Sequence, residues 1–297
     1  MKTSTRLPAF ALSLLVCAQG VAGARQKTAR TGAAQGGGGG AVVLAVSKHE
    51  ANVTTEPVVI YRGGAYVKPP VEDEAGSRSF VREYFRPGRQ FRILSGGGEA
   101  GALTVSKYLE PGCVGLVAEA KAETQARLGG RVKALATDSQ TLGGGPVARR
   151  APTEAERARA VELARASYAK NRVPAALVSK MEVVNLTATD LDRDGRFELV
   201  GSFLVEKKGA PAAANAYTLF LIMEPAGETL KAAWEWFHRG YEGEYADRHF
   251  IDQVDFDGDG VGEIVAEGTY YESNDYVIYK RQQGRWRPVY QGGGGGC

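Results

Sequence analysis

Two acidic nonapeptides carry the residue types and the spacing that are most able to do chemistry. Each has Asp at positions one, three and five, Gly at position six and Glu at position nine. Oxygen ligands at this spacing can surround one centre, to which the backbone carbonyl of position seven would add another oxygen. Like charges about 4 Å apart repel by roughly 4 kcal/mol at an effective dielectric near 20, so four clustered carboxylates are strongly unfavourable without a cation. The spacing therefore predicts two sites for a divalent metal ion.

Calcium is the predicted ion, because it accepts about six to eight oxygens in flexible geometry. The predicted ligands of the first site are Asp190, Asp192, Asp194, Glu198 and the backbone carbonyl of Arg196. The predicted ligands of the second site are Asp255, Asp257, Asp259, Glu263 and the backbone carbonyl of Val261. An EF-hand fits poorly, because position twelve is Gly201 or Ala266 where a bidentate Glu is required, and the flanking residues favour strands. An Asp/Gly-rich solvated turn without a metal is the alternative.

The two acidic loops occupy equivalent places in a repeated pattern of strand-like segments. In the first unit these segments lie at 182–189, about 198–206, 216–223 and 229–237, and the loop follows the first of them. The second unit repeats the order at 249–254, 263–271, 275–280 and 285–290. One strand, an acidic loop and three further strands are the content of a four-stranded propeller blade.

The order D-x-D-x-D-G-x-x-E followed by an apolar strand resembles the calcium loops of FG-GAP/VCBS-type repeats, the integrin-like β-propeller repeats. The resemblance covers about residues 182–290, and its specific part is the two nonapeptides. It implies β units that are stabilised by calcium at the ligands named above. Two units cannot close a propeller, so residues 41–140 would either hold two divergent blades or form a small β-domain beside a two-unit calcium module.

The sequence as a whole predicts a mainly β fold with antiparallel four-stranded blade-like units, in a partial or small propeller-like arrangement. Short apolar runs over 41–140 predict a β-rich N-terminal domain. Residues 141–174 are expected to be a linker and one short helix, because Thr153 to Glu156 fits a capping box and Pro174 ends an Ala-rich run. Residues 175–297 are the predicted two-repeat calcium-binding module.

The N-terminus has the features of a secretory signal peptide over 1–24, with a positive start, a short apolar run and a small-residue cleavage site at Ala24. The Gly-rich segment 25–40 is expected to be a flexible leader. The protein is therefore expected to be secreted, periplasmic or at the cell surface, with no transmembrane segment. Cleavage removes Lys2 and Arg6, so 37 basic residues become 35 against 34 acidic ones, and this balance of +1 predicts no nucleic-acid partner.

Two cysteines would remain after cleavage, Cys113 and Cys297. An even pair in an oxidising compartment predicts a disulfide between them. The glycine run from Gly292 to Gly296 is expected to be a flexible tether for Cys297. That tether would let Cys297 pair with Cys113 or with a second molecule, and both pairings stay open.

Enzyme signatures are mostly missing from the sequence. It contains no Walker A loop, no HExxH motif and no G-x-S-x-G elbow. The string Gly96-x-Gly98-x-x-Gly101 is followed by strand-like residues, where a dinucleotide site needs a helix. The sequence therefore assigns no catalytic residue and no organic cofactor.

One histidine-containing segment is compatible with acid/base chemistry. His238 and His249 lie near three acidic residues, Glu242, Glu244 and Asp247. Such a group could act in general acid/base catalysis or bind a transition metal, and the alternative is a polar loop between the two units.

Several aromatic residues of the second half could form a platform on which a carbohydrate stacks. They are Trp234, Trp236, Tyr270, Tyr271 and Tyr276. Strand alternation places Trp234 and Trp236 on one face, so ordinary packing between sheets is the alternative.

These observations together predict a secreted calcium-binding β-repeat protein that acts as a binding or structural module, with calcium stabilising the fold. Its ligand would be an unidentified protein or glycan. The alternative is a secreted hydrolase or glycan-processing enzyme in which calcium serves as a scaffold.

Overall fold

The computed structural model describes residues 40–110, 115–145, 149–206, 216–240 and 245–297. The predicted signal peptide, the predicted leader up to residue 39, and Cys113 lie outside these residues. Residues Gly38–Cys297 form one compact unit, and the predicted division of this part into domains stays a prediction. No helix in the described ranges is long and apolar enough to cross a membrane.

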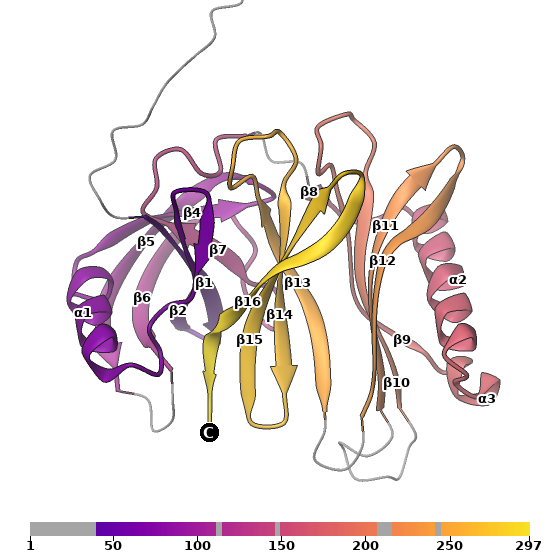
Figure 1. Ribbon diagram of the computed structural model, residues 1–297, viewed down its shortest axis with the longest axis horizontal. Coiled ribbons are helices and arrows are strands. Elements are labelled where there is room, and N and C mark those ends of the chain that lie inside the picture. Colours follow the sequence, from indigo (N-terminus) through magenta and orange to yellow (C-terminus); the bar gives the residue numbers. More distant parts are fainter. Residues whose placement is uncertain (1–39, 111–114, 146–148, 207–215, 241–244) are drawn as a thin grey trace, which may run out of the picture. The chain divides into compact units, whose positions relative to one another are not determined.

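The first part of the described chain is a closed six-stranded antiparallel barrel (Figure 1). Its strands, in spatial order, are β1 (Ala41–His49), β7 (Ala134–Thr137), β4 (Gln90–Ser95), β5 (Gly98–Leu109), β6 (Val117–Thr124) and β2 (Asn52–Arg62). The ring closes because β1 pairs with β2 as well as with β7, and the short strand β3 (Ala65–Val67) extends from β2. Of the two alternatives for residues 41–140, divergent blades are therefore excluded, because the strand pairing continues around a ring and does not end at open edges.

Apolar side chains fill the barrel, and one helix packs against them. The helix α1 (Glu74–Tyr84) buries Phe80 and Tyr84 in the same core as the barrel strands. It begins at Asp73, whose carboxylate accepts hydrogen bonds from the backbone N–H groups of Ala75 and Gly76. This side-chain cap satisfies N–H groups that have no partner inside the helix.

The rest of the described chain forms two antiparallel sheets whose strands lie in chain order. The five-stranded sheet contains β8 (Arg149–Arg150), β9 (Glu182–Thr189), β10 (Glu198–Glu206), β11 (Ala216–Ala226) and β12 (Thr229–Arg239). The four-stranded sheet contains β13 (Ala246–Val254), β14 (Glu263–Tyr270), β15 (Ser273–Gln282) and β16 (Arg285–Gly296). The prediction of a mainly β, antiparallel fold is confirmed, and the strand-like segments of both units coincide with strands.

The barrel and the two sheets pack in layers (Figure 1). Between the sheets, Phe220 of β11 stacks on Tyr279 of β15 with ring centroids 5.5 Å apart. The opposite face of the four-stranded sheet meets the barrel, where Tyr290 and Phe256 pack against Tyr66. The four-stranded sheet therefore lies between the barrel and the five-stranded sheet.

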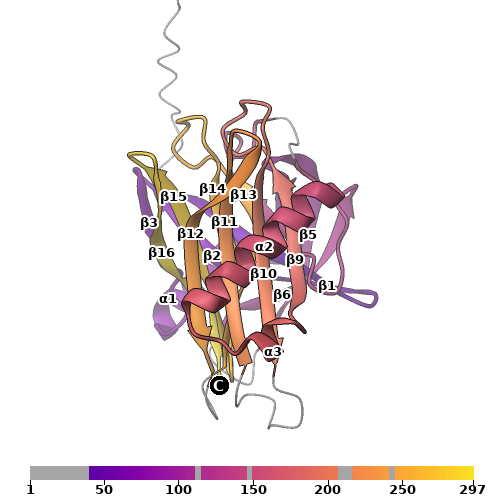
Figure 2. The ribbon, with the colours of Figure 1, turned by 90° about the vertical axis from the view of Figure 1, so that its right-hand side faces the viewer.

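The helix α2 (Glu154–Lys170) covers the outer face of the five-stranded sheet (Figure 2). The predicted capping box is present, because Thr153 and Glu156 each accept a hydrogen bond from the other's backbone N–H. Tyr168 is fully buried under the helix and donates its hydroxyl to the carbonyl oxygen of Phe203 at 2.9 Å. This hydrogen bond fixes the helix on the sheet.

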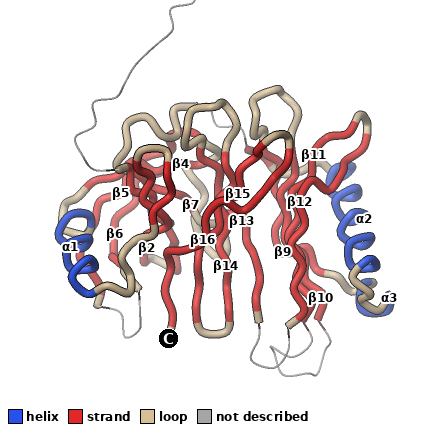
Figure 3. The backbone as a smooth tube through the Cα atoms, viewed as in Figure 1, coloured by secondary structure: helices blue, strands red, loops and turns tan. Residues whose placement is uncertain are grey.

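The described residues contain three helices, α1, α2 and α3 (Ala175–Val178), where the sequence predicted one short helix (Figure 3). The prediction missed α1 because Gly and Ser lower its intrinsic helix propensity. Burial of Phe80 and Tyr84 in the barrel core supplies the tertiary packing that stabilises it.

The glycine run at the C-terminus is a strand, which corrects the prediction of a flexible tether. Gly292 and Gly295 belong to β16 and pair with residues of β15. A Cβ at Gly293 would lie 2.6 Å from the carbonyl oxygen of Val58 in β2. The glycines are ordered because they form ladder hydrogen bonds and because only their missing side chains allow the barrel to come this close.

The predicted disulfide between Cys113 and Cys297 involves a residue outside the described ranges. A Cβ on Gly115 would lie 3.4 Å from the Cα atom of Gly295. The chain therefore comes together within two residues of each cysteine, and the pairing itself stays a prediction.

Candidate metal centre

Two equivalent turns hold the predicted metal ligands. The first acidic loop, Asp190–Glu198, connects β9 to β10, and the second acidic loop, Asp255–Glu263, connects β13 to β14. Each loop follows the first of four consecutive strands. The last residue of each loop, Glu198 or Glu263, is already the first residue of the next strand and is buried.

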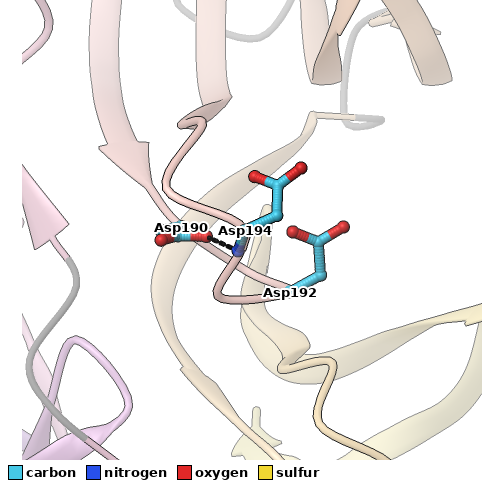
Figure 4. Close-up of side chains that lie close together, drawn as sticks. All are labelled: Asp190, Asp192 and Asp194. Carbon is cyan, nitrogen blue, oxygen red and sulfur yellow. Dashed lines mark hydrogen bonds between the residues drawn. The ribbon is translucent and has the colours of Figure 1, made fainter. Parts of the chain in front are cut away.

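The first acidic loop is held by its own carboxylates (Figure 4). Asp190 accepts hydrogen bonds from the backbone N–H groups of Asp194 and Gly195, both at 3.1 Å. Asp194 accepts one from Arg196 at 2.7 Å, and Glu198 accepts one from Leu191 at 2.9 Å. Gly195 has a φ of +83°, a conformation that glycine adopts without the steric cost of a Cβ.

The second acidic loop repeats three of these four hydrogen bonds at the same relative positions, whereas the second N–H group that donates to Asp255 is that of Gly258, at 2.7 Å. Asp255 accepts from the N–H of Gly260 at 3.1 Å, and Gly260 has a φ of +91°. Asp259 accepts from the N–H of Val261 at 2.9 Å, and Glu263 accepts from Phe256 at 2.8 Å. The carboxylates at positions one, five and nine therefore have the same structural role in both loops. They stabilise the turn by accepting hydrogen bonds from backbone N–H groups.

The three aspartates of each loop converge. Each offers one carboxylate oxygen that lies within 4.8 Å of the corresponding oxygens of the other two, in the group Asp190, Asp192 and Asp194 and in the group Asp255, Asp257 and Asp259. Exposed acidic groups of this kind are also common without an ion. The side chain of Arg196 forms an ion pair with Asp194, and Val261 packs against the core between the sheets. The predicted role of their backbone carbonyls stays a prediction.

The two acidic loops lie beside each other. The backbone N–H of Gly262 donates to the carbonyl oxygen of Leu191 at 2.7 Å. Arg281 donates to Asp192 at 3.0 Å and so joins β15 to the first acidic loop. The two candidate sites therefore belong to one continuous edge of the packed sheets.

Two basic residues at the loops were missed in the sequence analysis. The ammonium group of Lys280 contacts Asp257 at 2.8 Å, Asp259 at 3.2 Å and Glu263 at 2.5 Å. The next residue, Arg281, reaches the first acidic loop, because neighbouring side chains of a strand point to opposite faces. Nothing in the sequence pattern marks a Lys-Arg pair in β15 as a partner of loops that lie far away in the chain.

Burial and the neighbouring charges shift the pKa values of the two buried glutamates. Burial raises the pKa of Glu198 to about 7, and the charges of Asp192 and Asp194 add to the increase. Burial also raises the pKa of Glu263, although the hydrogen bond from Lys280 opposes that increase. Burial lowers the pKa of Lys280, but its hydrogen bonds to Asp257 and Glu263 outweigh this effect and raise the pKa well above the usual value. The carboxylates of the second acidic loop thus stabilise the positive charge of Lys280.

Among the described residues, the two histidines of the histidine-containing segment line different cavities. His238 of β12 lines one cavity with Trp236 and Arg248. His249 lines another cavity, where its Nε2 atom lies 2.8 Å from Asp247. The remaining acidic residues of this segment, Glu242 and Glu244, lie outside the described residues.

The string Gly96-x-Gly98-x-x-Gly101 lies in the hairpin between β4 and β5. The residues after Gly101 continue β5, as the sequence analysis expected, so no helix N-terminus is present there to receive a phosphate. Comparison of the chain with protein-family models, with curated protein sequences and with solved structures gave no match.

Proposed function

We propose that the chain is a secreted calcium-binding β-repeat protein of the FG-GAP/VCBS kind, which acts as a binding or structural module stabilised by calcium. The observation that carries this proposal is the equivalence of the two acidic loops. In both, the carboxylates of positions one, five and nine accept hydrogen bonds from the same relative N–H groups. Local hydrogen bonds therefore hold these three carboxylates in equivalent positions in the two loops.

The two four-stranded units are proposed to be blade-like repeats. The strands β9–β12 and β13–β16 each form an antiparallel run in chain order, with an acidic loop in the first connection. Their faces pack together through Phe220 and Tyr279, as neighbouring blades would. The barrel occupies the other side of the second unit.

Calcium is the ion that suits these loops best. The available ligands are carboxylate oxygens on partly exposed turns, which form a hard and adaptable set. Ions that bind only the folded chain stabilise it by RT ln(1 + [L]/Kd). With a Kd of about 0.1 mM and about 2 mM calcium, each site would contribute roughly 2 kcal/mol.

The test is a thermal melt of residues 25–297 in calcium, in magnesium and in chelator. We expect a calcium-specific rise of several degrees in the melting temperature. Asp257→Ala removes an aspartate of the second acidic loop and should abolish most of the calcium dependence at that site. Asp192→Ala tests the first acidic loop in the same way.

A matched control is Glu119→Ala, which removes a surface carboxylate of the barrel that pairs with Lys107. It should leave the calcium-dependent rise unchanged. Equal melting temperatures with and without calcium in the wild type and in both loop variants would show that the loops are solvated Asp/Gly turns without a metal. The enzyme alternative has less support, since His238 and His249 line different cavities.

A further inference from the structure

A cavity of about 610 Å³ opens near the ends of β12 and β14. Aromatic and polar side chains line it, including Trp236, His238, Tyr245, Arg248, Tyr270 and Tyr271. Tyr270 is seven residues from Glu263 along β14, a distance of roughly 23 Å at about 3.3 Å per residue. The cavity is therefore separate from the second acidic loop.

One wall of the cavity is a stack of planar groups from both sheets. The guanidinium carbon of Arg248 lies 5.0 Å from the ring centroid of Trp236 and 5.4 Å from that of Tyr270. The ring of His238 stacks on Trp236 with centroids 5.9 Å apart and an interplanar angle of 7°. The order Tyr270, Arg248, Trp236, His238 thus forms a continuous wall across β14, β13 and β12.

Hydrogen bonds to a single carboxylate hold this wall in place. Arg248 and Tyr270 each donate to Asp275 at 3.0 Å, and Gln291 donates to the same carboxylate at 2.6 Å. A Cβ at Gly268 would overlap Arg248 Nη1, so the glycine opposite Arg248 lets the guanidinium lie across the strand. Side chains that are already held in place lose little entropy when a ligand binds.

Arg248 is also a buried polar side chain with an unused donor. The residue is 6% exposed, and its Nε atom has no hydrogen-bond partner among the described residues.

Tyr271 provides an exposed aromatic ring at the rim. It is 64% exposed, more than any other large hydrophobic residue in the described part of the chain. It lies in the turn between β14 and β15, next to Glu272 and Ser273, which also line the cavity. Exposed aromatic rings beside a cavity are typical of binding surfaces.

The charges around the cavity restrict the kind of ligand. Arg248 is neutralised by Asp275 and already occupies the faces of Trp236 and Tyr270. A cationic ligand would therefore compete with Arg248 for the aromatic faces. An anionic ligand would meet the carboxylate of Glu272 at the rim. A neutral ligand with an apolar face and several hydroxyl groups avoids both conflicts.

We propose that this cavity binds a neutral saccharide, with the C–H face of a pyranose ring against the exposed ring of Tyr271 and its hydroxyls at Glu272 and Ser273. This proposal adds a ligand class to the proposed function. It rests on that function only in treating the chain as a binding module. The lining residues include none of the loop carboxylates. Trp234 and Trp236 both pack against the core between the sheets, but only Trp236 also lines the cavity.

The test is calorimetric titration of residues 25–297 with cellohexaose, chitohexaose, mannohexaose and xylohexaose. At least one should bind with a Kd of about 1 mM or tighter. Tyr271→Ala should weaken that binding about threefold to tenfold, because it removes one exposed aromatic contact without disturbing the core. Trp236→Leu should also weaken it, because the loss of this ring removes the packing that holds Arg248 at the cavity wall.

Trp234→Phe is the matched control, since it changes a tryptophan of the same strand outside the cavity, and it should leave the affinity unchanged. No binding of any of the four sugars at about 10 mM would overturn the proposal. Equal affinities of the wild type, Tyr271→Ala and Trp236→Leu would also overturn it. A melt that is insensitive to calcium would contradict the proposed calcium role and leave the saccharide result standing, so the two failures are distinguishable.

Discussion

At the scale of single residues, Lys280 is the side chain that decides how the second acidic loop behaves. Its ammonium group lies among three carboxylates of that loop, one of which, Glu263, is buried. It supplies the positive charge that a metal ion would otherwise supply. The first acidic loop has no ammonium of this kind in the described structure, and its Asp192 and Asp194 pair with arginines.

Lys280→Gln tests whether lysine and calcium compete. Without calcium, we expect the free energy of unfolding to fall by about 2 kcal/mol, because the buried Glu263 loses its charged partner. With calcium, the rise in melting temperature should exceed that of the wild type, since the ion no longer displaces an ammonium group. Thermal melts at several calcium concentrations measure both effects.

The control for this variant is Lys107→Gln, which removes a surface ion pair with Glu119 at 3.0 Å. Exposed pairs contribute little, so its stability should change by less than about 1 kcal/mol. A calcium-dependent rise in Lys280→Gln that equals or falls below that of the wild type would contradict competition at the second acidic loop.

At the scale of elements, β16 is the most unusual strand, because its second half is glycine. Glycine is poorly suited to strands on propensity alone. The run is nevertheless ordered between β15 and β2, where added side chains would collide with the neighbouring backbone. Close packing of backbones has overridden the local preference.

Gly294→Ala should show this cost directly. Gly294 has a φ of +69°, and a Cβ there would overlap the carbonyl oxygen of Asn274. We expect a loss of about 3 kcal/mol in the free energy of unfolding, measured by urea denaturation, from backbone strain and steric overlap together.

Gly284→Ala is the matched control, because Gly284 has a φ of +73° but open space around a Cβ. It should cost only about 1 kcal/mol, the strain of the backbone conformation alone. Equal losses in the two variants would show that the close approach to β15 does not constrain Gly294.

At the scale of the whole molecule, a buried carboxylate joins the barrel to the four-stranded sheet. Asp252 of β13 is fully buried and accepts hydrogen bonds from the backbone N–H of Gly96 in the β4–β5 hairpin at 2.8 and 3.0 Å. Arg149 lies 3.8 Å away and partly compensates its charge. Burial raises the pKa of Asp252 to about 6, while the charge of Arg149 opposes that increase.

This contact makes stability depend on pH. Because the pKa of Asp252 is higher in the folded than in the unfolded chain, the folded state holds the proton more tightly. Its contribution to stability is fully present below about pH 4 and is lost as the pH rises through about 6. Asp252→Asn carries no charge at any of these pH values and should lack this trend.

The free energy of unfolding of Asp252→Asn relative to the wild type should therefore rise by about 2–3 kcal/mol between pH 4 and about 7.5. Urea denaturation of both proteins at matched pH values measures this difference. A difference that stays constant with pH would show that Asp252 titrates alike in the folded and unfolded chains.

Much of the candidate site follows from local sequence. The carboxylates at positions one, five and nine accept hydrogen bonds from N–H groups within seven residues of the chain, one of them the N–H of the Gly at position six, so their spacing alone predicts the turn. The capping box of α2 is equally local, since Thr153 and Glu156 are three residues apart. The strands of both units were predictable because apolar runs between turn residues need only neighbouring residues to be recognised.

What the tertiary structure decided depends on residues that are far apart in the chain. Closure of the barrel requires β1 to pair with β7, about ninety residues away, and strand register over such distances leaves no mark in local pattern. The same holds for the contact of Lys280 with the second acidic loop and for the different cavities that His238 and His249 line. Propensity and turn chemistry act within a few residues, whereas pairing, burial and charge neutralisation arise only when distant segments pack together.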